Sequence, residues 1–180
     1  MYLWIGLGIE EKSEHEIRDY CKEVNKDFSV NEQSFTLPQH ISLKTSFNTE
    51  NHEKIIKELK IKFSNNKKLN LNVEKVGSVP GVIWLVIKET LDLRNYHNEI
   101  LRYLESEYDI SKIGFDGDTF KFHSTLFQDV DNKELVEKLY NKIDKSIFEN
   151  RELIVNRIYF GVSEIGKVGT YKVIDSLELK

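Results

Sequence analysis

The sequence predicts an α/β (α+β) fold made of two lobes with pseudo-twofold symmetry. Short apolar runs rich in β-forming residues alternate with amphipathic helical segments along the 180 residues. The order strand, helix, strand containing a histidine, helix, strand occurs twice, and the two histidines, His40 and His123, stand about half a chain apart. We therefore expect a single domain over residues 1–180, with repeat halves of about 1–80 and 81–180.

The first half begins with a strand and a helix. An apolar run over residues 2–9 predicts a buried strand. Ser13 and Glu16 have the spacing of a capping box, and the apolar residues that follow recur at helical period. After the break at Pro38, apolar and polar residues alternate over 40–47, which predicts a half-buried strand.

A helix and two strands follow. Asn48 or Thr49 can cap the helix, whose apolar stripe is formed by Ile55, Ile56, Leu59 and Phe63. Residues 69–76 alternate in polarity and residues 82–87 are continuously apolar, so both are predicted to be strands, the second of them central.

The second half repeats this order. An apolar helical stripe (Leu93, Tyr96, Ile100, Tyr103, Leu104) precedes a loop at 114–119 and a strand at 120–127. Asp131 and Glu134 are spaced as the cap and third residue of another helix. The chain ends with two predicted strands, at about 153–162 and 171–179.

Composition and charge argue against several classes of function. The 26 basic and 30 acidic residues give a formal net charge of −4, so we expect no binding of long duplex nucleic acid. No apolar stretch approaches the roughly 18 residues of a membrane span, and the first residues lack the basic leader of a signal peptide. Cys21 is the only cysteine and is expected to be buried. We expect a cytoplasmic monomer without membrane contact.

The residues that indicate chemistry are two short motifs, His40-Ile-Ser42 and His123-Ser-Thr125. Because side chains alternate across a strand, each histidine shares a face with the hydroxyl residue two positions later. Two imidazoles near pH 7 can act as general base and general acid in displacement at phosphorus, while hydroxyls donate to the phosphate oxygens. This set requires no metal and no cofactor. The alternative is that both are ordinary surface histidines.

The paired motifs resemble the two-histidine (2H) phosphoesterase superfamily, which includes the RNA 2′,3′-cyclic phosphodiesterases long called 2′-5′ RNA ligases. The resemblance implies two antiparallel sheets around a central cleft with helices outside, and metal-independent action on 2′,3′-cyclic phosphate RNA ends or 2′-5′-linked oligonucleotides. It implies that His40 is the acid and His123 the base, although the symmetric motifs allow the reverse. Ser42 and Thr125 would hold phosphate oxygens. The expected partner is a small nucleotide or RNA end.

This chain departs from the resemblance at two places. Many members have proline before the second histidine and arginine three residues after its threonine, where this chain has Phe122 and Gln128. The missing arginine removes a cation that could hold a phosphate. By strand parity Lys44 and Lys121 could replace part of that charge.

Several aromatic residues and histidines lie outside the two motifs. Phe47 and Phe127 are candidates for stacking on a base, whereas Trp4 and Trp84 lie in apolar runs and are expected in the core. The remaining histidines (His15, His52, His97) are expected at surface or boundary positions of helices. A non-catalytic nucleotide-binding module on the same fold is the alternative function.

Overall fold

The computed structural model describes residues 1–28, 30, 35, 37–114, 116–128, 130, 132–167 and 169–180. The strands are β1 (Tyr2–Ile9), β2 (His40–Asn48), β3 (Leu69–Val79), β4 (Val82–Ile87), β5 (His123–Phe127), β6 (Glu152–Ser163) and β7 (Lys172–Glu178). The helices are α1 (Glu11–Asn25), α2 (His52–Phe63), α3 (Leu91–Tyr108) and α4 (Lys133–Lys142), with a short 3₁₀ turn, η2 (Lys145–Ile147), that the sequence pattern did not predict.

All the strand pairs are antiparallel, and they follow one continuous path in the order β2-β1-β6-β3-β4-β5, with β7 also paired to β6. Strand β3 joins the two parts of this path, because its residues 69–72 pair with β6 and its later residues pair with β4. The predicted fold class is confirmed, and the two expected sheets are connected through β3.

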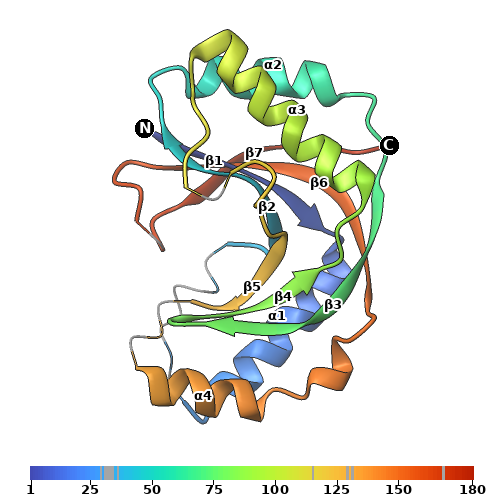
Figure 1. Cartoon of the computed structure of the whole chain (residues 1–180), viewed down its shortest axis with the longest axis vertical. Coiled ribbons are helices and arrows are strands. Elements are labelled where there is room, and N and C mark those ends of the chain that lie inside the picture. The colour runs from blue at the N-terminus through green and yellow to red at the C-terminus, as the bar shows by residue number, and fades with distance from the viewer. Residues whose placement is uncertain are drawn as a thin grey trace.

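The strands curve around one open side, and the helices lie on the outside (Figure 1). Helices α2 and α3 cover the part formed by β7, β6, β1 and β2, while α1 and α4 lie against the part formed by β3, β4 and β5. In two places a helix from one half of the sequence packs on a strand from the other half. Helix α1 from the first half contacts β5, and α3 from the second half contacts β2.

The apolar core lies between the strands and these outer helices. In β1 the side chains of Leu3, Ile5 and Leu7 are fully buried on this side, and the intervening residues face the open side. Cys21 of α1 is also buried there, and burial raises the pKa of its thiol to about 12, so it behaves as a small apolar group.

Three expected helix caps differ from the structure. Helix α1 begins at Glu11 and has no side-chain cap, because Ser13 donates to Glu10 instead of accepting from a backbone amide. Before α2, Thr49 accepts a hydrogen bond from the Asn51 amide in a turn that precedes the helix.

The cap of α4 is Asn132, whose side-chain oxygen accepts from the amides of Glu134 and Leu135. The predicted cap, Asp131, lies outside the described residues. None of the described helices combines the length and apolar character needed to cross a bilayer.

Candidate active site

Strands β2 and β5 carry the two histidine motifs on the open side of the bent sheet. His40 and Ser42 lie opposite Gly8 and Gly6 of β1. On β5, His123 and Thr125 lie opposite Val86 and Trp84 of β4. All four motif residues are half-buried, whereas the residues between them are buried. We call the surface that carries His40, Ser42, His123 and Thr125 the histidine face.

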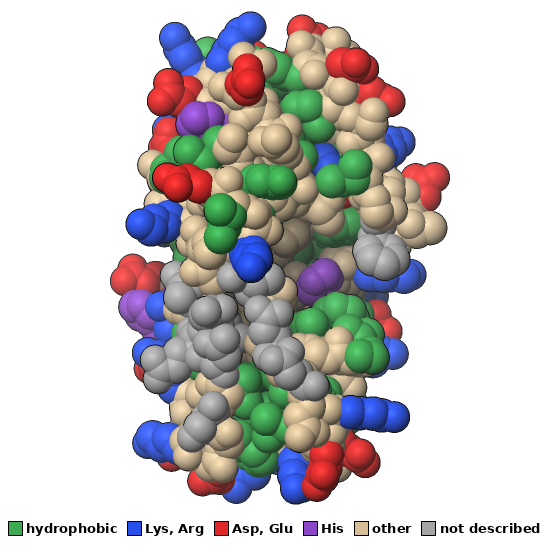
Figure 2. All heavy atoms as spheres, turned by 90° about the vertical axis from the view of Figure 1, so that its left-hand side faces the viewer, with side chains coloured by type: hydrophobic (Ala, Val, Ile, Leu, Met, Phe, Trp, Pro, Cys, Tyr) green, Lys and Arg blue, Asp and Glu red, His purple; other side chains and the backbone are tan. Residues whose placement is uncertain are grey.

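The open side of the sheet faces the viewer in the space-filling view. Figure 2 looks onto the open side of the sheet and shows a histidine side chain between the upper and lower halves of the molecule, beside a hollow in the surface. This is the side toward which the strands curve in Figure 1. A ligand can therefore reach both halves from this side.

A buried hydrogen bond joins the two motifs. Ser124, the residue after His123, donates its hydroxyl to Oε1 of Gln39, the residue before His40, at 2.8 Å. Both side chains are buried. The Gln39 amide donates to a carboxylate oxygen of Glu14 at 3.3 Å, so the start of α1 also supports this junction. The bond fixes the two histidine strands relative to each other.

Both histidines are held in the same tautomer. Nδ1 of His40 lies 2.7 Å from the carbonyl oxygen of Pro38, and Nδ1 of His123 lies 2.7 Å from the carbonyl oxygen of Lys121. A carbonyl oxygen can only accept, so each Nδ1 carries the hydrogen. Nε2 is then the nitrogen of each ring that exchanges a proton with a ligand.

The surroundings of both histidines favour the neutral ring. Burial lowers the pKa of His40 to about 4, with a further contribution from the nearby His123 that is partly opposed by the bond to Pro38. Burial also lowers the pKa of His123. Both imidazoles are therefore neutral at pH 7 in the ligand-free protein. The expectation of one protonated and one neutral histidine holds only if a bound anion raises one of these pKa values.

Trp4 lies against His40 on this face. Its ring meets that of His40 edge-on, with centroids 4.2 Å apart, and its Nε1 donates to Oγ of Ser42 at 3.1 Å. The indole covers Gly6 and Gly161, where an added Cβ would lie 2.3 Å and 2.7 Å from its ring atoms. Because Ser42 Oγ accepts from the indole, its own hydrogen remains available to a ligand.

Trp84 takes a corresponding place beside the second histidine. Its ring centroid lies 4.5 Å from that of His123, and the indole lies over Gly77, where an added Cβ would meet Nε1 at 2.6 Å. Trp84 lies directly opposite Thr125 in the pairing of β4 with β5. Trp4 is not the pairing partner of Ser42, which lies opposite Gly6, and its indole reaches Ser42 along the strand. Trp4 is buried, as expected, although it packs against His40, whereas Trp84 is half-buried beside His123, so the expectation of a core position is wrong for Trp84.

The sequence contains only a partial signal for these tryptophans. The pattern Trp4-x-Gly6 puts a large ring and a residue without a side chain on one face of a strand, which leaves room for the ring to lie flat. The glycine under Trp84 is on the neighbouring strand, so no local pattern reveals it.

The expectation that Lys44 lines the groove is wrong. Register shifts in β2 place Lys44 opposite Ile5, a core residue, so that the lysine turns to the buried side. Its Nζ donates to Asp116 at 2.5 Å, and both side chains are fully buried. Asp116 also accepts from the hydroxyl of Thr45 and from the amide of Ile113.

His97 supports the same loop and is not a surface residue. Its Nδ1 lies 2.6 Å from the carbonyl oxygen of Leu43, and its Nε2 accepts from the amide of Gly117 at 3.0 Å. The residue is fully buried, and burial lowers its pKa. Together with Asp116, it ties the loop that precedes β5 to strand β2.

The two phenylalanines proposed to stack on a base are in the core. Phe47 is 4% exposed and Phe127 is fully buried against the ring of Phe35. Lys121 is exposed, and it lies close enough to Glu89 to help lower the pKa of that carboxyl. Contact of Lys121 with a phosphate stays a prediction.

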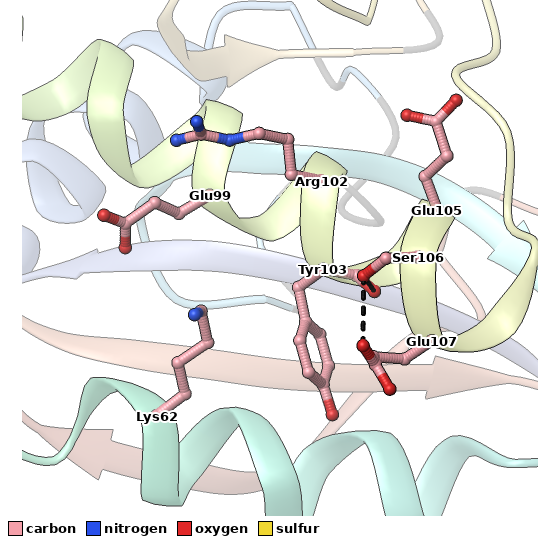
Figure 3. Close-up of a pocket in the computed structure, with 7 residues that line it drawn as sticks. All are labelled: Lys62, Glu99, Arg102, Tyr103, Glu105, Ser106 and Glu107. Carbon is pink, nitrogen blue, oxygen red and sulfur yellow. Dashed lines mark hydrogen bonds between the residues drawn. The ribbon is translucent and has the colours of Figure 1, made fainter.

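Within the described ranges, no three histidine, cysteine or acidic side chains converge in a way that could hold a metal ion. A depression of about 560 Å³ lies between α2 and α3 (Figure 3), lined by Lys62, Glu99, Arg102, Tyr103, Glu105, Ser106 and Glu107. These helices cover the outer side of the sheet, so this depression is separate from the histidine face.

The comparisons agree with this architecture. The family model of the 2′-5′ RNA ligase superfamily matches residues 16–164. The fold is similar to that of TT0787 of Thermus thermophilus, with a TM-score of 0.70, 13% identity, and coverage of 99% of this chain and 98% of that one. No curated protein gives a significant sequence match.

Two other solved structures show the same fold at low identity. E. coli LigT in its apo form gives a TM-score of 0.61, with 15% identity and coverage of 99% and 96% of the two chains. Usb1 of Kluyveromyces marxianus gives 0.53, with 14% identity and coverage of 99% and 98%. Structures of LigT complexed with NADP⁺, 3′-AMP, ATP and phosphate have the same fold.

Proposed function

The chain belongs to the 2′-5′ RNA ligase superfamily of two-histidine phosphoesterases, and on this premise we propose that it is a metal-independent phosphodiesterase. Its substrates are 2′,3′-cyclic phosphate RNA ends or 2′-5′-linked oligonucleotides. The observation that carries the proposal is the matched pair of histidines, each with Nδ1 anchored on a carbonyl oxygen and a hydroxyl residue two positions later.

The pair supports displacement at phosphorus. One Nε2 takes a proton from water as the new P–O bond forms, and the other Nε2–H gives a proton to the ribose oxygen as the old P–O bond breaks. After the reaction the base is protonated and the acid is neutral. Proton exchange with solvent returns both rings to their starting states, so the cycle has no net change in their protonation. The family resemblance assigns His40 as the acid and His123 as the base. The shared tautomer is compatible with either direction.

Ser42 and Thr125 are suited to hold the non-bridging phosphate oxygens. The Ser42 hydroxyl already accepts from Trp4 and is oriented by that bond. The Thr125 hydroxyl makes no hydrogen bond to the part of the chain that the structure describes. Donors aimed at oxygens whose negative charge grows in the transition state lower the barrier.

Binding of the substrate supplies the protonated histidine. Both rings are neutral in the ligand-free protein because burial lowers their pKa values. A phosphate anion beside them favours the charged imidazolium and raises those pKa values. The complexes of LigT with 3′-AMP, ATP, NADP⁺ and phosphate concern that protein, and they support a nucleotide or RNA end as the class of ligand here.

The proposal is tested by hydrolysis of a 2′,3′-cyclic-phosphate-ended oligonucleotide and of 2′-5′ oligoadenylate in excess chelator. We expect turnover that falls by at least about a hundredfold in His40→Ala and in His123→Ala. His15→Ala is the matched control, because His15 is 59% exposed on α1 and its one ion pair in the described chain is with Glu14. Turnover unchanged in either motif variant contradicts the proposal.

A second substrate assigns the acid and the base. In a nucleoside 3′-(p-nitrophenyl phosphate) the neighbouring ribose hydroxyl attacks from the side of the histidine that serves the ribose oxygen, and p-nitrophenolate departs without a proton on the opposite side. If His40 serves the ribose oxygen, we expect this substrate to restore most of the activity of His123→Ala and none of that of His40→Ala. The opposite pattern reverses the assignment. Nucleotide binding without turnover of any of these substrates supports the alternative of a non-catalytic binding module.

A further inference from the structure

Arg157 and Tyr159 of β6 lie on the histidine face and have no assigned role. Gly8 of β1 pairs with His40 on one side and with Arg157 on the other, and Gly6 pairs with Tyr159. Residues paired directly across strands point to the same face of a sheet. The arginine therefore occupies the position two strands away from His40, about 10 Å between Cα atoms.

Both side chains lie over the gap that Gly8, the pairing partner of His40, leaves on this face. An added Cβ on Gly8 would lie 2.5 Å from Cγ of Arg157 and 2.4 Å from the far edge of the Tyr159 ring. The guanidinium carbon lies 5.9 Å from the centre of that ring. The arginine stem and the phenol thus fill the space above Gly8, directly beside the histidine.

The charge of Arg157 is only partly neutralised. Its Nε donates to the Asn156 side chain at 3.1 Å, and Nη2 lies 3.5 Å from Glu178, whose side chain is 65% exposed. An exposed ion pair at that distance is weak and screened by salt. Arg157 also hydrogen-bonds to the side chain of Tyr159. A guanidinium has five N–H donors, so these three contacts leave donors for a phosphate.

The matching position on the other side of the histidine face holds Lys75. Val86 of β4 pairs with His123 on one side and with Lys75 of β3 on the other, as Gly8 does with His40 and Arg157. Lys75 is exposed and has no ion pair within the described residues. The two cations thus differ in surroundings, and only Arg157 has an aromatic phenol packed against it.

From this geometry we infer that Arg157, with Tyr159, forms a second anion subsite that holds the 5′-phosphate of the nucleotide whose 2′,3′-phosphate is at the histidines. The inference rests on the proposed function, in which His40 protonates the leaving ribose oxygen, so that this ribose and its 5′-phosphate lie on the His40 side. The subsite would favour an RNA end, which carries that phosphate, over a cyclic mononucleoside phosphate. Arginine suits this role because its planar donors match phosphate oxygens.

The test compares two ligands that differ only in this phosphate. Adenosine 3′-monophosphate and adenosine 3′,5′-bisphosphate are titrated at low salt, with tryptophan fluorescence as the readout, since both tryptophans contact the motif histidines. We expect the bisphosphate to bind at least about tenfold more tightly. Arg157→Gln should bring the ratio of the two affinities close to one and leave the monophosphate affinity within about twofold.

Three variants control this result. Lys75→Gln removes the corresponding cation on the His123 side and should leave the affinity ratio unchanged. Arg157→Lys keeps a positive charge without the planar fork and should retain an intermediate ratio. Glu178→Gln removes the competing carboxylate and should increase the ratio. Circular dichroism of each variant checks that it is folded.

The outcomes separate this inference from the proposed function. Equal affinity of the two nucleotides for the parent protein, no binding of the bisphosphate, or loss of the ratio in Lys75→Gln but not in Arg157→Gln overturns the subsite. If the subsite behaves as expected but neither 2′,3′-cyclic adenosine monophosphate nor its 5′-phosphorylated form is hydrolysed, the subsite stands and cyclic phosphodiesterase activity on these substrates fails.

Discussion

Ser124 donates its hydroxyl hydrogen to Gln39 Oε1 at 2.8 Å, in a buried bond between the residue after one motif histidine and the residue before the other. The bond links β5 to the segment that leads into β2, although the two residues are far apart in the chain. It makes the separation of the two imidazoles a property of the fold and not of either strand alone.

Removal of this bond should slow the reaction more than it weakens binding. Ser124→Ala leaves the buried side-chain oxygen of Gln39 without its hydrogen-bond donor. This lowers the free energy of unfolding by about 1–3 kcal/mol and loosens the junction of the two strands. We expect kcat to fall about tenfold with KM little changed, because positioning matters most in the transition state. Steady-state kinetics on the cyclic-phosphate substrate measures both.

Ser163→Ala provides the matched control for this positioning role. Ser163 is equally a buried serine, but its hydroxyl bonds to Thr170 and accepts from the amides of Ile165 and Gly166, all in the turn between β6 and β7. It should lower the unfolding temperature without changing kcat. If both serine variants have the same kcat as the parent protein, the junction is structural only.

The two tryptophans should differ in what their indole nitrogens do. Trp4→Phe keeps an aromatic ring beside His40 but removes the N–H that donates to Ser42. We expect kcat/KM to fall about three- to tenfold, in line with loss of one hydrogen bond that orients a phosphate-binding hydroxyl. Trp84→Phe changes the same atoms beside His123, where no indole bond to Thr125 is formed within the described chain, and should have little effect.

Ser42→Ala completes this comparison. If Trp4 acts through Ser42, the double variant Trp4→Phe/Ser42→Ala should be no less active than Ser42→Ala alone. Strictly additive losses would show that the indole nitrogen acts by another route.

Anion binding should strengthen as the pH falls. In the ligand-free protein the pKa of His40 is about 4 and that of His123 is also lowered, so both rings are neutral at pH 7. A bound dianion raises these pKa values, and binding therefore takes up protons. For sulfate, which stays a dianion across the range, we expect affinity to rise by up to about tenfold per pH unit from pH 8 to 5.5.

Calorimetry in buffers of different ionisation enthalpy measures this proton uptake directly. His40→Gln/His123→Gln removes both titrating rings and should bind sulfate weakly with no dependence on pH. An affinity of the parent protein that does not change over this range would mean that the histidines do not contact the anion.

Removal of one partner of the buried ion pair between Lys44 and Asp116 should lower the free energy of unfolding. Asp116→Ala leaves the fully buried Lys44 ammonium without its partner and should destabilise the protein by about 3–5 kcal/mol. Lys44→Met/Asp116→Ala removes both charges and should cost less than Asp116→Ala alone. Denaturant unfolding of the two variants measures the difference. Glu134→Gln, which breaks an exposed ion pair with Lys138, is the control and should leave the free energy of unfolding almost unchanged.

The chain's local patterns were sufficient to predict most elements and the two motif histidines. Strand β4 has the predicted bounds, and His40 and His123 lie on strands with Ser42 and Thr125 on the same face. These features depend on the alternation of side chains along a strand and on burial of its apolar face, both of which a short stretch of sequence determines.

Strand β5 is shorter than predicted. It starts at His123 because the preceding segment is held by Arg94, which donates to the carbonyl oxygens of Gly117 and Phe120 and lies over the ring of Phe122. The sequence pattern of these residues alternates as in a strand, but no local signal shows the helix that holds them.

Tertiary structure alone decided what surrounds the histidines. Lys44 turns into the core because register shifts in β2 change the side on which it emerges, and Phe47 and Phe127 pack there as well. The bond between Ser124 and Gln39 joins strands from the two halves of the chain.

The physical reason is the range of the interactions. Alternation and apolar burial act between neighbours in the chain, so the sequence by itself determined the strands and which motif residues share a face. Bulges, the glycine gaps under Trp4 and Trp84, and the position of Arg157 across Gly8 from His40 depend on which strands pair and in which register. Those pairings form between residues distant in sequence and exist only once the whole sheet has folded.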